Sequence, residues 1–137
     1  MKFLTLVLIG TLLFISKNIV AQNNTITATV INTTSNKGKI SYALFTKDNF
    51  RGKPLQAISS KIKENKSVAV FKNIPTGEYA IICFHDKNNN DKMDFEPNGM
   101  PIEDYGVSNN IINRFGPPEY EQAKFVVTDK NVSLKIK

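Results

Sequence analysis

The sequence predicts an all-β protein that folds as one Greek-key β-sandwich of about seven strands with a single long, ordered loop. Two observations support this prediction. Short runs of residues alternate between apolar and polar side chains, which is typical of strands with one buried face. Breaks rich in Asn, Gly, Pro and Asp separate these runs, and no segment beyond residue 21 repeats with a helical period.

The positions of the expected strands follow from this alternation. Ile26, Ala28 and Val30 share one face of the first run, with threonines on the other face. Residues 79–84 are apolar on both faces, which indicates a central strand. Further strands are expected at 40–44, 67–71, 125–127 and 132–136, and residues 128–131 are expected to form a hairpin turn between the last two.

Tyr79 stands at the start of the central strand, directly after a turn that contains Pro75 and Gly77. In Greek-key sandwiches a tyrosine at this place bonds back to the preceding turn and forms a tyrosine corner. An ordinary core tyrosine is the alternative interpretation.

Residues 1–21 have the layout of a secretory signal peptide, so residues 22–137 are expected to form the folded domain. Lys2 gives a positive start, an apolar stretch runs from Phe3 to Ile15, and Ala21 offers a small residue for cleavage. The apolar stretch is too short for a comfortable membrane span, and an uncleaved membrane anchor is the alternative interpretation. We therefore expect an exported protein, periplasmic or extracellular, with no membrane span after cleavage.

The charge pattern argues against nucleic-acid binding, and the cysteine content excludes an internal disulfide. The formal net charge is +6, but the lysines are scattered and the arginines are only Arg51 and Arg114. Proteins that bind nucleic acid specifically usually cluster their lysines and arginines, so we expect no nucleic-acid partner. We also expect the protein to be a monomer. Cys83 is the only cysteine, which rules out an internal disulfide, and its apolar neighbours favour burial.

The long loop is predicted at residues 86–121 and begins with a candidate calcium site. Asp86, Asn88 and Asn90 match the first half of a known calcium-loop pattern, in which oxygen side chains at alternate positions converge on the ion. Asp91 and Pro97 stand where an EF-hand needs glycine and glutamate, so this is not an EF-hand. A solvated turn without metal is the alternative. The predicted ligands are Asp86, Asn88, Asn90, Lys92 through its carbonyl, Asp94 and Glu96.

The same loop is expected to present a binding surface for an envelope protein or a glycan. The candidate surface residues are His85, Glu103, Asp104 and Tyr105. Four aromatic residues near the loop either line this surface or pack the loop onto the sheet, and they are Tyr105, Tyr120, Phe95 and Phe115.

The first functional prediction is therefore an exported, non-enzymatic module in which a weak calcium loop stabilises a binding surface. A small metal-dependent or thiol–histidine enzyme centred on Cys83, His85 and Asp86 is the second, because Cys83 and His85 share one face of their strand. No nucleophile-elbow motif Gly-x-Ser-x-Gly is present for a serine hydrolase. A purely structural envelope protein without a ligand is the third.

Three motifs in order carry a resemblance to a known family. They are the run Phe84-His85-Asp86-x-Asn88-x-Asn90-x-x-x-Asp94, the run from Gly99 to Asn110, and Phe115-Gly116-Pro117-Pro118 followed by Ala123-Lys124-Phe125. This pattern resembles the bacterial secreted family called domain of unknown function 2141. The resemblance implies export in Gram-negative bacteria and an immunoglobulin-like or transthyretin-like sandwich, with no established activity. Many members have Asn-Gly where this chain has Asn90-Asp91.

Overall fold

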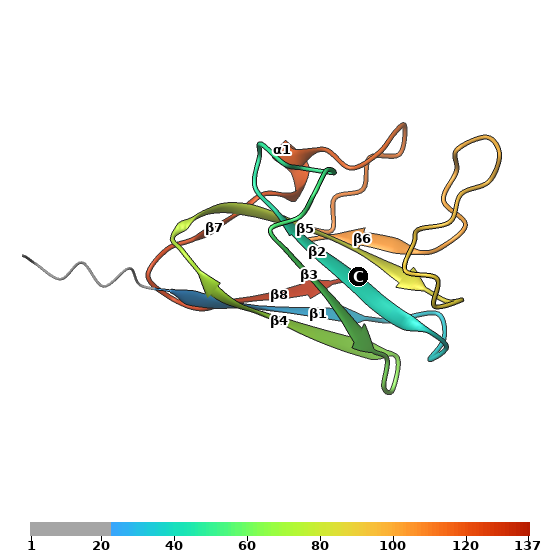
Figure 1. Ribbon diagram of the computed structural model, residues 1–137, viewed down its shortest axis with the longest axis horizontal. Helices are drawn as coiled ribbons and strands as arrows, with labels where there is room; N and C mark the ends of the chain where they lie inside the picture. Colours follow the sequence, from blue (N-terminus) through green and yellow to red (C-terminus); the bar gives the residue numbers. More distant parts are fainter. Residues whose placement is uncertain (1–22) are drawn as a thin grey trace, which may run out of the picture.

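Two β-sheets pack face to face in this protein (Figure 1). The computed structural model describes residues 23–137, so the predicted signal peptide at 1–21 lies outside the described residues. The three-stranded sheet has the order β4-β1-β8, with β1 (Asn24–Ile31), β4 (Lys66–Ile74) and β8 (Val132–Ile136). The second sheet contains β2 (Lys39–Phe45), β3 (Gln56–Lys61), β5 (Gly77–Asp86), β6 (Tyr105–Val107) and β7 (Phe125–Val127).

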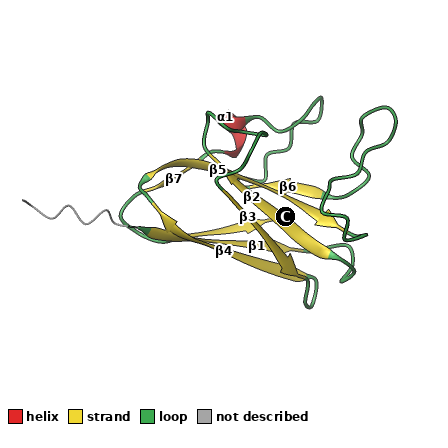
Figure 2. Cartoon of the chain, in the orientation of Figure 1, coloured by secondary structure: helices red, strands yellow, loops and turns green. Residues whose placement is uncertain are grey.

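The strand connections confirm the predicted all-β sandwich. Strands β1 and β4 pair antiparallel in one sheet, while β2 and β3 pair antiparallel in the other, which is a Greek key divided between two sheets. Strand β8 then joins β1 in parallel. Only one short helix, α1 (Tyr120–Ala123), interrupts the strands and loops of the described chain (Figure 2).

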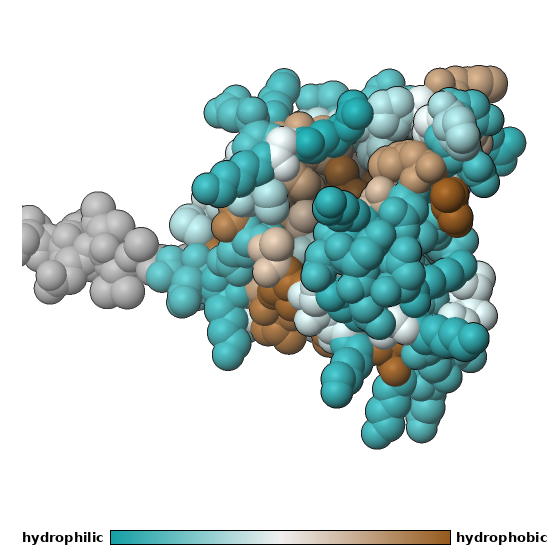
Figure 3. All heavy atoms as spheres, turned by 45° about the vertical axis from the view of Figure 1, so that its right-hand side comes forward, coloured by the Kyte–Doolittle hydropathy of each residue, from teal (hydrophilic) through white to brown (hydrophobic). Residues whose placement is uncertain are grey.

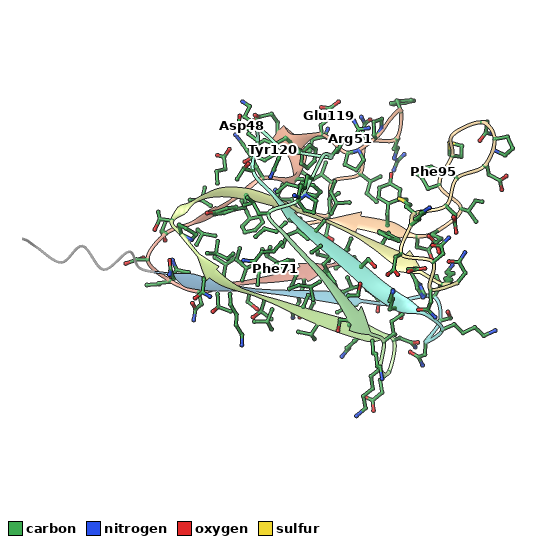
Figure 4. The ribbon with its side chains drawn as sticks, in the orientation of Figure 1. Asp48, Arg51, Phe71, Phe95, Glu119 and Tyr120 are labelled. Atoms are coloured by element: carbon green, nitrogen blue, oxygen red, sulfur yellow. The ribbon has the colours of Figure 1, made fainter. Side chains whose placement is uncertain are left out.

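The alternation in the sequence places the core between the sheets. Ile26, Ala28 and Val30 of β1 face the inside, as predicted. Strand β5 is central: Ile81 and Cys83 belong to the inter-sheet core, whereas Ile82 is partly buried on the opposite face. Other large core side chains are Ile40, Tyr42, Leu44, Phe71, Val127 and Ile136. Figure 4 shows Phe71 between the two sheets.

Three local predictions need correction. The segment 128–131 is not a hairpin turn, because β7 pairs with β5 in one sheet and β8 pairs with β1 in the other. Strand β3 was not predicted, because its polar and small residues give a weak alternation. The predicted loop at 86–121 is divided: Asp86 ends β5, and β6 and α1 lie within the rest.

A glycine allows β6 to form inside this loop. A Cβ atom at Gly106 would lie 2.6 Å from Cγ2 of Ile136, which is too close for any larger residue without movement. Gly106 pairs with Cys83 across the β5–β6 ladder. The C-terminal strand can therefore pack against β6, and the long loop is attached to the sheet at its middle.

The tyrosine corner is confirmed. The hydroxyl of Tyr79 donates a hydrogen bond to the carbonyl oxygen of Pro75 at 2.8 Å, and the residue is buried. The bond joins the start of the central strand to the turn that carries the chain from the three-stranded sheet to the five-stranded one.

We expect Tyr79→Phe to lower the free energy of unfolding by about 1 kcal/mol, because the Pro75 carbonyl loses its donor. Tyr105→Phe is the matched control, since the Tyr105 hydroxyl makes no hydrogen bond within residues 23–137. It should change stability by less than about 0.5 kcal/mol. Urea denaturation of the three proteins measures both values, and equal values for the two variants would contradict this account.

Candidate functional site

The carboxylate of Asp86 organises the loop that follows the central strand. Asp86 is fully buried, and its Oδ1 and Oδ2 accept hydrogen bonds from the backbone N–H groups of Asn90 at 3.0 Å and Asp91 at 2.9 Å. The Lys39 ammonium lies 3.7 Å from Oδ2. Asp91 takes a positive φ of 61°, so the chain turns sharply here without a glycine.

A second group of polar side chains closes the loop. The Asp94 carboxylate accepts hydrogen bonds from the side-chain amides of Asn88 at 2.7 Å and of Asn90 at 3.0 Å. Buried Glu103 accepts from the backbone N–H groups of Lys87 at 2.9 Å and Asp94 at 3.3 Å. The loop is therefore held by three carboxylates that bind backbone and amide donors.

The structure brings three of the six predicted metal ligands into side-chain contact. Asn88, Asn90 and Asp94 are in direct contact, and Asn90 connects them to Asp86. For Lys92, the backbone N–H donates to Asn90 Oδ1, whereas the predicted ligand was its carbonyl oxygen. Glu96 lies in an exposed turn and makes only backbone bonds, to Met100 and Gly99. Within residues 23–137, no three His, Cys, Asp or Glu side chains are grouped to hold a metal ion.

The candidate surface residues are distributed between the interior and the surface. His85 and Glu103 are buried, with exposed fractions of 3% and 5%. Asp104 is exposed and accepts from Thr34 Oγ1 at 2.8 Å and pairs with Lys87 at 3.0 Å. The Lys87 bond, with help from Thr34, lowers the pKa of Asp104 below its ordinary value. Tyr105 is half-buried on the outer face of the sheet.

The surroundings of Cys83 argue against a thiol–histidine enzyme centred on Cys83, His85 and Asp86. Cys83 is buried as predicted, and its Sγ lies 3.6 Å from the Gly106 carbonyl oxygen. Burial raises the pKa of the Cys83 thiol to about 12. A thiol with this pKa is protonated at neutral pH and is a poor nucleophile. The His85 ring bonds to the Lys37 carbonyl oxygen, and not to Cys83.

A large concave surface lies on the outer face of the five-stranded sheet. A groove of about 930 Å³ runs between the loop at 87–104 and the loop at 108–119. The strand register sets its floor, because residues paired across strands share a face. Ser59, Ser41, Phe84 and Tyr105 form one cross-strand row, and Ala57, Ala43 and Ile82 form the next. Small side chains on β2 and β3 keep the floor low.

The walls of the groove are apolar and exposed. Phe95, Met100 and Phe115 have exposed fractions of 55%, 61% and 99%, although their side chains are large. Met93, Pro117 and Pro118 also line the walls. Phe95 stands in the loop above the sheet (Figure 4), and hydrophobic side chains reach the surface among hydrophilic ones on this side of the molecule (Figure 3).

Both arginines of the chain line the same groove. Neither Arg51 nor Arg114 forms a salt bridge within residues 23–137. The one carboxylate in the lining, Asp91, is paired with Lys39. The groove therefore combines an apolar surface with two positive charges that form no salt bridge in the described part of the chain.

The family that matches this chain is a bacterial one. Its description is "Uncharacterized protein conserved in bacteria", domain of unknown function 2141, and it matches residues 28–135. The chain belongs to this family. The match extends from β1 to β8 and includes both loops of the groove, so the family domain and the sandwich coincide. No curated protein and no solved structure matches this family member.

Sequence reasoning found part of the groove of this family member. Of the four aromatic residues, three line the groove, as the interpretation of a binding surface predicted: Phe95, Tyr105 and Phe115. Tyr120 instead packs into the fold, with its ring centroid 5.4 Å from that of Phe50. The two arginines and the small residues of the floor were missed. Small side chains at Ser41 and Ala43, on the polar face of a predicted strand, are the signal that points to a low floor. Among residues 23–137 no helix is both long and apolar enough to cross a membrane.

Proposed function

We propose that this family member is an exported, non-enzymatic binding module whose ligand lies in the groove over the five-stranded sheet. The observation that carries the proposal is the exposure of large apolar side chains around a concave floor. Soluble proteins seldom expose such side chains in a group unless the group is a binding site. The groove volume of about 930 Å³ falls within the usual range for ligand sites, about 300–1,000 Å³.

The lining suggests the chemistry of the ligand. The apolar part of the groove lining would contact the apolar part of a ligand, and it includes Ile82, Phe84, Phe95 and Phe115. Arg51 and Arg114 offer hydrogen-bond donors arranged for a carboxylate, sulfate or phosphate group. The ligand expected from this lining is an amphipathic molecule with an apolar body and one anionic group.

Isothermal titration of the purified protein with decanoate tests this proposal. Decanoate should bind, and decanol, which has the same chain without the charge, should bind at least tenfold more weakly, a difference of about 1.4 kcal/mol. Arg114→Met should remove this preference for decanoate, and Phe115→Ser should weaken both ligands. Lys63→Met, in the turn before β4, is the matched charge control and should leave both affinities unchanged. If neither decanoate nor decanol binds, the proposal is contradicted.

Calcium binding in the loop at 87–104 is a second proposal, favoured by the convergence of Asn88, Asn90 and Asp94. Both amide side chains already contact the Asp94 carboxylate. Rotation of each amide would turn its oxygen toward the same point, and four side-chain oxygens would then surround a cation. A calcium ion here would tie the loop and so stabilise one wall of the groove.

Thermal unfolding with and without 2 mM calcium tests the second proposal. With a dissociation constant on the order of 10⁻⁴ M, calcium should add roughly 2 kcal/mol of stability. Asp94→Asn should abolish this gain, and magnesium should not reproduce it. Asp129→Asn, an acidic residue in the turn before β8, serves as the control. An unchanged melting temperature of the unsubstituted protein in calcium would refute calcium binding and leave the groove proposal intact.

A further inference from the structure

A second, smaller cavity lies between the two sheets, on the opposite face of β5 and β6 from the groove. Its volume is about 250 Å³. The inner part of its wall is apolar and buried, with Val30, Ile40, Cys83, Gly106 and Ile136. Exposed residues such as Asn32 and Asp104 also line it, so the cavity extends from the core to the surface at this end of the sandwich.

Two buried polar atoms in the lining have no hydrogen-bond partner in the described chain. They are Nδ1 of His85 and Oγ1 of Thr33. His85 is 3% exposed and alternates with Phe84, so its ring lies on the inner side of β5 together with Cys83. Buried polar atoms are nearly always paired in native proteins, so two unpaired ones beside one cavity indicate that a molecule bound there, water or ligand, pairs them.

The hydrogen bond on the other ring nitrogen fixes the chemistry of His85 Nδ1. Nε2 lies 2.7 Å from the carbonyl oxygen of Lys37, and a carbonyl oxygen only accepts. Nε2 therefore carries the hydrogen. In the neutral imidazole Nδ1 is then an acceptor with a free lone pair. A ligand at this place has to supply a donor, and a Thr33 hydroxyl can donate to the same ligand group.

We propose that this cavity binds a small, mainly apolar molecule with one hydroxyl group, which donates its hydrogen to His85 Nδ1 and accepts one from Thr33 Oγ1. A hydroxyl satisfies both atoms at once, because it donates one hydrogen bond and accepts others, and an attached apolar group would fill the apolar part of the cavity. An apolar cavity of roughly 150 Å³ holds benzene. The cavity here is larger, so a phenol with one small substituent is the expected size class.

The single histidine of the chain makes the test direct. In a ¹⁵N-labelled sample, long-range ¹H–¹⁵N spectra of the imidazole report which ring nitrogen carries the hydrogen. The free protein should show hydrogen on Nε2. Addition of p-cresol should shift the Nδ1 signal in a saturable manner. p-Xylene, in which a methyl group replaces the hydroxyl, should bind at least tenfold more weakly and should not produce that shift.

Two variants keep this proposal falsifiable and separate it from the groove. Thr33→Val preserves the shape of the side chain and should weaken p-cresol binding several-fold, whereas Thr29→Val, outside the cavity on β1, should not. Arg114→Met should not affect p-cresol, because that residue lies in the groove. Equal binding of p-cresol and p-xylene, loss of p-cresol binding in Arg114→Met, or an unmoved Nδ1 signal at saturation would overturn the proposal. Absence of p-cresol binding would also overturn the proposal, because the cavity would then hold only solvent.

Discussion

The buried carboxylate of Asp86 is the constraint on which the rest of this structure depends. It stands at the last residue of the central strand and is fully buried, so both of its oxygens must be satisfied. The backbone N–H groups of Asn90 and Asp91 satisfy them, and Lys39 on the neighbouring strand balances the charge. The chain is thereby forced to turn away from the sheet immediately after β5. The loop wall of the groove begins at this turn.

The two faces of the central strand, β5, contact different parts of the structure. Its inner side chains, Tyr79, Ile81 and Cys83, build the core against the three-stranded sheet. Its outer side chains Ile82 and Phe84 form the apolar part of the groove floor. An antiparallel sheet with one solvated face normally shows polar residues there. The apolar outer face of β5 is therefore explained by the two loops and α1, which cover part of it and leave the rest as a groove.

Sequence reasoning succeeded where the signal is local. The inward faces of β1 and β2, the central strand and the tyrosine corner at Tyr79 all follow from alternation and turn residues within a few positions. It failed where the outcome depends on distant contacts. The pairing of β8 with β1 rather than with β7 is decided by packing across the sandwich, which no pattern near Asp129 reveals. Strand β6 forms because Gly106 lets Ile136 approach, and these residues are far apart in the sequence.

In the candidate sites, too, the features set by nearby residues could be predicted and the features set by distant contacts could not. The oxygen-rich run after β5 indicated a folded polar loop, and the convergence of Asn88 and Asn90 on Asp94 agrees with that pattern. The groove required the register of four strands to bring Ser59, Ser41, Phe84 and Tyr105 into one row. Arg51 and Arg114 belong to different connections and line one groove only because both connections border the same sheet. The unpaired state of His85 Nδ1 depends on which groups surround it in three dimensions.

Amide hydrogen exchange at Asn90 and Asp91 tests the central role of Asp86 most directly. In the unsubstituted protein these two amides should be protected, because the buried carboxylate holds them. In Asp86→Ala both should exchange at the rate of an exposed loop, while the amides of the β1–β4 ladder keep their protection and show that the sandwich is intact. The account is contradicted if Asn90 and Asp91 exchange freely in the unsubstituted protein, or if their protection survives the loss of the carboxylate.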